Sequence, residues 1–372
     1  MLCDLSKFSK KDDEIIQTGI LPFDITIGGV VRGKVMEVFS QSGVGKSTLA
    51  MSIIRNLVAQ GERCLYIDVE RGVQDSVLSS YGLDVYNLPD YKGMFAILNP
   101  VTYSDVENIL DTTIGPKAKN RFKFVVIDSV TMLMPAKMAE AESVYDVQDI
   151  AINARQSTLL LQKIKVLCDI TQATVLLISQ MRYKNKGTAR FMRMELDSAS
   201  GQAGEFIPDI RFTLQKGEPI LKGEKTIMND QKIVAGNVSK IMSIKNRIRR
   251  PLIPVKCPVI YGRGVSNLYF IGEVLMDSGL GTKARNGVVT VQLPGFSTPE
   301  IKVRGMQLLY EYIRGNYDEL VSYLYANGYF DLIKGEDVPH SVEEGIEGGD
   351  YIVGDDTSSD STNPVEDNST EL

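Results

Sequence analysis

Residues Ser40–Ser47 read SQSGVGKS, and this stretch decides the fold because of what stands on either side of it. It follows the apolar run Val35–Phe39 (VMEVF) and leads into Ser47–Gln60, where apolar residues recur at helical spacing. Gly43 and Gly45 let backbone N–H groups converge on an anion, and the N-terminus of the following helix adds positive potential. The stretch therefore predicts a strand, a phosphate-binding loop and a helix, in that order.

The side chains of this loop have separate expected roles. Lys46 reaches the β- and γ-phosphates of a nucleotide, and the Ser47 hydroxyl ligates Mg²⁺. Ser40 stands where the usual pattern has its first glycine, which alters the first turn of the loop but not the role of the lysine. The residues expected to bind the nucleotide are Ser40, Gln41, Ser42, Gly43, Val44, Gly45, Lys46, Ser47 and Thr48.

Beyond the loop, short apolar runs alternate with helical patterns for roughly 200 residues. This alternation predicts an α/β fold in which helices cover a parallel sheet. Later, Ile210–Ile260 is more purely strand-like, and Met306–Ile313 and Leu320–Tyr325 predict two helices of a small separate domain. The further strands expected are Cys64–Asp68, Phe95–Leu98, Phe124–Asp128 and Thr174–Ser179, and the further helices are Tyr103–Ile114 and Ala151–Ile170.

Two carboxylates are expected to complete the nucleotide site. Asp128 ends the hydrophobic run Phe124–Asp128, the position from which an aspartate holds the Mg²⁺ shell. Glu70 follows the run CLYID, at the end of a parallel strand where ligands bind, and there it can orient a water in line with the γ-phosphate. By position alone, a solvated loop acid explains Glu70 equally well.

Composition excludes several classes of protein. The chain has 372 residues, 43% of them hydrophobic and 24% charged, as in a globular protein. It has no apolar run long enough to span a bilayer and no apolar stretch near its N-terminus, so we expect a cytoplasmic protein. Its one histidine, His340, excludes a His-rich metal centre. Its four cysteines lack metal-ligand spacing, and we expect buried thiols at Cys64, Cys168 and Cys257.

The charges are divided unevenly along the chain. Twelve acidic residues and no Lys or Arg follow from Glu336 to the end, whereas residues 1–335 have 41 basic and 35 acidic residues, a net of +6. This asymmetry is typical of a regulated binder of polyanions, although a tail that only solvates the protein gives the same pattern. The predicted divisions are a short N-terminal segment (1–17), an ATPase core (18–266), a small C-terminal α/β domain (267–335) and a disordered acidic tail (336–372).

Six segments occur in a characteristic order: TGILPFDITIGG (Thr18–Gly29), RGKVMEVFSQSGVGKST, YIDVE, VVIDSV, LLISQMR (Leu176–Arg182) and IKNRIRRP (Ile244–Pro251). Together they resemble the RecA family of homologous-recombination ATPases over residues 18–330, with a phage-type recombinase of the UvsX kind as one reading. The resemblance implies a RecA-like P-loop core and a DNA-dependent ATPase that uses ATP and Mg²⁺. It implies helical filaments on single-stranded DNA, pairing with homologous duplex DNA in recombination and repair, and single-strand-binding and mediator proteins as further partners.

The resemblance also implies roles for single residues. Glu70 matches the catalytic glutamate, and Gln180 matches the glutamine that senses the γ-phosphate and passes its presence to the DNA loops. Lys245 and Arg247 match two basic residues that reach across a filament interface to the γ-phosphate of a neighbouring subunit.

Two departures from the family pattern are visible. The family's adenine-stacking tyrosine falls at Val77, so recognition of the base must differ, and Tyr81 is a weak substitute. Bacterial members have a longer N-terminal helix that docks on the next subunit, whereas 17 residues precede Thr18 here and Phe8 is the one candidate for a shorter anchor.

DNA contacts are implied for two loops. Residues from about Ala139 to Asp149 match the first loop, and Arg155 follows it. The second loop, Arg182–Gln202, is basic and offers Phe191 as a wedge between bases. By itself a basic loop is more often a solvated segment. The expected DNA-binding residues are Arg155, Arg182, Lys184, Lys186, Arg190, Phe191, Arg193, Gly201 and Gln202.

Two other functions stay open at this point. A hexameric DNA helicase shares this ATPase core but normally adds a substantial N-terminal domain, larger than the 17 residues before Thr18. An ATP-gated DNA-binding scaffold would not hydrolyse ATP, and the pair Glu70 and Gln180 argues against it.

Overall fold

The structure is a computed structural model of the chain, and it describes residues 14–83, 93–140, 150–186, 193–198, 201–226, 229–247 and 253–330. These residues all belong to one compact unit, which ends at Val338. The domain boundaries after residues 17, 266 and 335 stay predictions.

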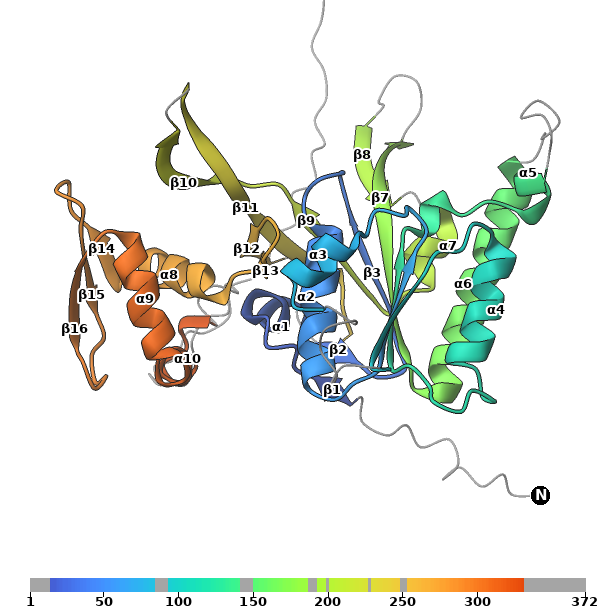
Figure 1. The fold of residues 1–372 in the computed structure, drawn as a ribbon, viewed down its shortest axis with the longest axis horizontal. Coiled ribbons are helices and arrows are strands. Elements are labelled where there is room, and N and C mark those ends of the chain that lie inside the picture. The colour runs from blue at the N-terminus through green and yellow to red at the C-terminus, as the bar shows by residue number, and fades with distance from the viewer. Residues whose placement is uncertain are drawn as a thin grey trace, which may run out of the picture. The chain divides into compact units, whose positions relative to one another are not determined.

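A large, mostly parallel sheet forms the centre of the fold (Figure 1). The described strands follow the order β13-β12-β11-β9-β3-β7-β6-β4-β5, and the pairs from β9 to β5 are parallel. This arrangement confirms the predicted α/β class. The parallel strands are β3 (Val35–Ser40), β4 (Cys64–Asp68), β5 (Phe95–Leu98), β6 (Phe124–Asp128), β7 (Thr174–Lys186) and β9 (Ile210–Gln215). The antiparallel side adds β10 (Pro219–Thr226), β11 (Asn229–Lys245), β12 (Pro254–Ile260) and β13 (Gly264–Val265).

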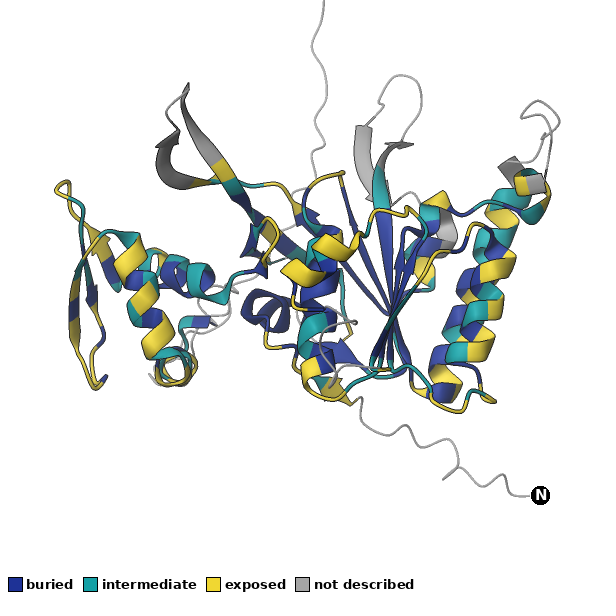
Figure 2. Ribbon diagram, viewed as in Figure 1, coloured by how far each residue is buried: buried dark blue, intermediate teal, exposed yellow. Residues whose placement is uncertain are grey.

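Helices cover both faces of this sheet, and each face has its own hydrophobic cluster. Along β4, Cys64 and Tyr66 belong to one cluster while Leu65 and Ile67 belong to the other. Strands buried on both faces read as continuous apolar runs, which is why the sequence located them (Figure 2). The first face carries α1 (Leu21–Ile27), α2 (Lys46–Ala59) and α3 (Asp75–Ser80), and the second carries α4 (Tyr103–Thr113) and α6 (Ile150–Thr171).

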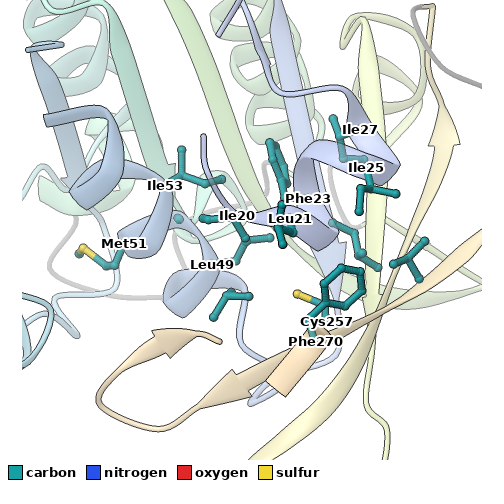
Figure 3. Close-up of a cluster of buried hydrophobic side chains, with 14 of the residues drawn as sticks. Ile20, Leu21, Phe23, Ile25, Ile27, Leu49, Met51, Ile53, Cys257 and Phe270 are labelled. Carbon is teal, nitrogen blue, oxygen red and sulfur yellow. The ribbon is translucent and has the colours of Figure 1, made fainter. Parts of the chain in front are cut away.

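The described residues after 266, which end at Phe330, form three helices and a small antiparallel sheet. The predicted pair of helices is confirmed, whereas the first helix and the position of the sheet were not predicted. The first helix contributes Phe270 to the same buried cluster as Leu49 of α2 and Cys257 of β12 (Figure 3). The elements are α8 (Asn267–Asp277), β14 (Gly281–Lys283), β15 (Val288–Gln292), β16 (Glu300–Arg304), α9 (Met306–Gly315) and α10 (Tyr317–Ala326).

One expected loop is partly a hairpin. Strand β7 continues past the predicted end at Ser179 to Lys186 and pairs antiparallel with β8 (Arg193–Ser198). The prediction of an irregular loop over Arg182–Gln202 is therefore wrong for these strands and for α7 (Gly201–Phe206). Beyond the main sheet, residues 181–186 of β7 pair with β8. This part of the hairpin is mostly polar in sequence, so it lacks the apolar run that marks a buried strand.

The expectation about the cysteines is confirmed. Cys64, Cys168 and Cys257 are buried thiols, and burial raises the pKa of Cys168 to about 12. Cys3 lies outside the described residues. Among the helices that the structure describes, none is long and apolar enough to cross a membrane.

Candidate nucleotide and DNA site

The loop between β3 and α2 has the backbone that its glycines require. Gly43 and Gly45 have φ angles of 73° and 110°, in the left-handed region that glycine adopts without strain. A Cβ atom on Gly45 would lie 3.1 Å from Cγ1 of Val259 on β12, so the loop is packed closely against that strand. From β11, the Ser239 hydroxyl donates to the Val44 carbonyl at 2.9 Å. Ser239 thus fixes the loop, a role that no sequence motif marks.

Lys46 is the first residue of α2, directly after this loop, and it is only 9% exposed. Its ammonium donates to the Gln41 carbonyl at 3.0 Å, and to the carbonyl and hydroxyl of Ser40 at 3.2 and 3.3 Å. Burial lowers the pKa of Lys46, while the nearby charges of Asp128 and Glu70 oppose that shift. Ser40, at the position of the usual first glycine, therefore supplies two oxygens that hold the lysine.

Asp128 gathers two hydroxyl groups at the carboxyl end of β6. Ser47 Oγ donates to Asp128 Oδ2 at 2.6 Å, and the Tyr66 hydroxyl donates to the same oxygen. Burial raises the pKa of Asp128, while these two hydrogen bonds oppose the shift. Strands β4 and β6 run parallel with Asp68 opposite Asp128, which brings the ends of both strands to one edge. A hydroxyl and a carboxylate are oxygen ligands of the kind Mg²⁺ prefers, so the residues fit that ion.

Glu70 lies in the turn that follows β4, and this turn is held in place by Asp68. The buried Asp68 carboxylate accepts hydrogen bonds from Gly72 N at 3.2 Å and Val73 N at 2.9 Å. Across the edge, Gln180 Nε2 lies 3.4 Å from Glu70 Oε1, so the structure brings the two predicted residues together. Asp68 was missed by sequence analysis, although an aspartate at a strand end two residues before Glu70 is a usable signal.

A pocket of about 140 Å³ lies beside these groups. Val77 and Tyr81 both line it, together with Met51 and Val73. Tyr81 is 5% exposed and packs in the buried cluster on the α2 face. The remaining lining residues are Ser47, Thr48, Tyr66, Asp68, Glu70, Gly72 and Asp128.

Lys245 and Arg247 contact the segment that follows α7. Lys245 Nζ donates to the Phe206 and Pro208 carbonyls at 3.0 and 2.6 Å, and Arg247 Nη1 lies 3.4 Å from Asp209 Oδ1. Burial, followed by the charge of Arg247, lowers the pKa of Lys245. The two cations thus contact residues 206–209, which follow the second predicted DNA loop in the chain, and the Arg247 side chain is 65% exposed.

The predicted DNA-binding residues are divided between described and undescribed parts of the chain. Arg155 is exposed on α6. Arg182, Lys184 and Lys186 lie on β7, where they pair in register with Asp197, Glu195 and Arg193 of β8. Gly201 and Gln202 begin α7. Arg190, Phe191 and residues 141–149 of the first loop lie outside the described residues.

Comparison with known proteins yields one consistent family. The family model described as the RecA N-terminal domain matches residues 2–266. Protein RecA of Thermotoga maritima is 27% identical over 274 residues, which cover 72% of this chain and 69% of that protein. Protein RecA of Acidiphilium cryptum is 28% identical over 312 residues, which cover 83% of this chain and 82% of that protein. The family match spans the nucleotide loop and all four residues with predicted catalytic roles.

Proposed function

This chain belongs to the RecA family, and we propose that it is a DNA-dependent ATPase that forms helical filaments on single-stranded DNA. The bound strand is then paired with homologous duplex DNA and exchanged in recombination and repair. ATP and Mg²⁺ are its cofactors.

One observation supports this proposal more than any other. Gln180, which lies 3.4 Å from Glu70, stands on β7 only two residues before the first cation of the basic hairpin. A single continuous strand thus joins Gln180, the hydrogen-bond partner of the predicted hydrolytic carboxylate, to the predicted DNA contacts. A change at the nucleotide site has a direct covalent route to the DNA site along β7.

The residues of the site divide the chemistry of hydrolysis between them. Lys46 offers its ammonium to the phosphates, and Ser47 and Asp128 offer the oxygen ligands of the metal, which balances phosphate charge when bound. Glu70 accepts the proton of the attacking water as that water adds to the γ-phosphorus and ADP leaves. In a filament, Lys245 and Arg247 of a neighbouring subunit add positive charge at the same phosphate.

Electron microscopy of negatively stained samples tests this assignment. The full chain is mixed with single-stranded DNA, Mg²⁺ and a slowly hydrolysed ATP analogue, with ADP as the matched control. We expect helical filaments with the analogue and few with ADP. Closed rings would indicate the helicase function instead, and the absence of any DNA-bound assembly would contradict the proposal.

A further inference from the structure

Tyr66 is a buried polar group that the proposed mechanism does not use. It lies in the middle of β4, paired with Ile97 of β5 and Val126 of β6, and it is 0% exposed. Its ring belongs to the buried apolar cluster on the α2 face. A hydroxyl taken out of water in this way costs free energy unless it finds a hydrogen-bond partner. Its acceptor is Oδ2 of Asp128.

Two donors of different kinds therefore meet on one carboxylate oxygen. Ser47 is exposed in the first turn of α2, and its Oγ lies 2.6 Å from Asp128 Oδ2. Tyr66 approaches the same oxygen from inside the sheet layer, where packing fixes its ring.

We propose that Tyr66 is a positioning residue for the magnesium ion: its buried hydroxyl fixes the Asp128 carboxylate against Ser47, in the orientation that receives the metal. Tyr66, Ser47 and Asp128 all line the same pocket. This inference rests on the proposed nucleotide site. Partners that orient a metal ligand change metal affinity by roughly 10- to 100-fold in known sites. The structure thus assigns the difference between loose and tight magnesium binding to a side chain that is itself buried within the sheet.

Tyr66→Phe removes the hydroxyl and keeps the ring. The readout is binding of a fluorescent ADP analogue to the full chain, titrated with Mg²⁺ and repeated in excess EDTA. We expect the Mg²⁺ concentration for half-maximal effect to rise about 10-fold or more, with nucleotide affinity in EDTA unchanged. A Mg²⁺ titration that coincides with that of wild type would overturn the inference. An equal loss of affinity in EDTA would also overturn it, because Tyr66 would then support only the fold.

A matched control and a double variant sharpen the test. Tyr103→Phe removes a hydroxyl that donates to Asn153 on the opposite face of the sheet, and it should leave the Mg²⁺ titration unchanged. In an Asp128→Asn background, Tyr66→Phe should have no further effect, and a second shift of equal size would contradict action through Asp128. If wild type itself showed no Mg²⁺ dependence, the nucleotide site would fail, a result distinct from failure of Tyr66 alone.

Discussion

Single side chains at the nucleotide site are already held in working positions by neighbours in the same chain. Asp68 ties down the turn that carries Glu70, and Ser239 holds the loop that carries Lys46. Side chains fixed before a ligand arrives lose little entropy when it binds, which favours catalysis by positioning. Glu70 therefore has support from Asp68, a residue to which the sequence analysis gave no role.

Glu70→Gln tests the proposed proton acceptor. The amide keeps the size of the side chain but cannot take up the proton of water, so we expect phosphate release to fall about 10²- to 10⁴-fold. Binding of ATP and of single-stranded DNA should persist, which should leave long-lived filaments. Phosphate release and DNA-binding titrations measure the two effects.

Asp75→Asn is the matched control, because Asp75 is an exposed carboxylate at the start of α3, five residues from Glu70. It should hydrolyse ATP at the wild-type rate. Hydrolysis at the wild-type rate by Glu70→Gln would show that the catalytic base is another residue.

The elements differ in how well the sequence predicted them. Strands β4, β5 and β6 were predicted with their observed bounds. β4 and β6 are buried along their whole length, which leaves an unbroken apolar run, and the edge strand β5 is a short apolar run as well. The hairpin of β7 and β8 was missed, since its residues are mostly polar and its pairing depends on two segments meeting in space. The small sheet β14–β16 was missed because half-buried strands alternate polar and apolar residues over short lengths.

The same limit applies to the site. Lys46, Ser47 and Asp128 could be predicted as site residues because each has a fixed place in a motif at the end of a strand or the start of a helix. Tyr66 and Ser239 were missed, because their roles arise only when strands distant in sequence lie side by side. Contacts between residues that are distant in the chain leave no local pattern in the amino-acid sequence.

At the scale of elements, the basic residues of β7 should set the strength of DNA binding. Replacing Lys184 and Lys186 together by alanine should weaken binding to single-stranded DNA. Each lost phosphate contact should reduce the slope of log affinity against log salt by about 0.7. The measurement is fluorescence anisotropy with labelled DNA at several salt concentrations. The matched control is Lys283→Ala with Lys302→Ala on the small sheet, and equal slopes for both double variants and wild type would contradict the assignment.

The whole assembly raises the question of which residues act between subunits. Within a single chain, Lys245 and Arg247 contact residues 206–209. Their predicted role at the phosphate of a neighbouring subunit therefore requires the assembled filament. Arg247→Ala and Lys46→Ala should each be inactive or weak alone. Mixed, they should regain part of the DNA-stimulated activity, because some interfaces combine an intact loop with an intact arginine. No recovery at any mixing ratio would count against a shared site.

Phosphate release by the full chain, with ATP and Mg²⁺ and with or without single-stranded DNA, tests the central claim most directly. The account predicts slow release without DNA and clearly faster release with it, because β7 couples Gln180 and Glu70 to the basic hairpin. The stimulation should weaken as salt rises, since phosphate contacts hold the DNA. Equal rates with and without DNA, at a salt concentration where DNA binding is measured, would contradict the account.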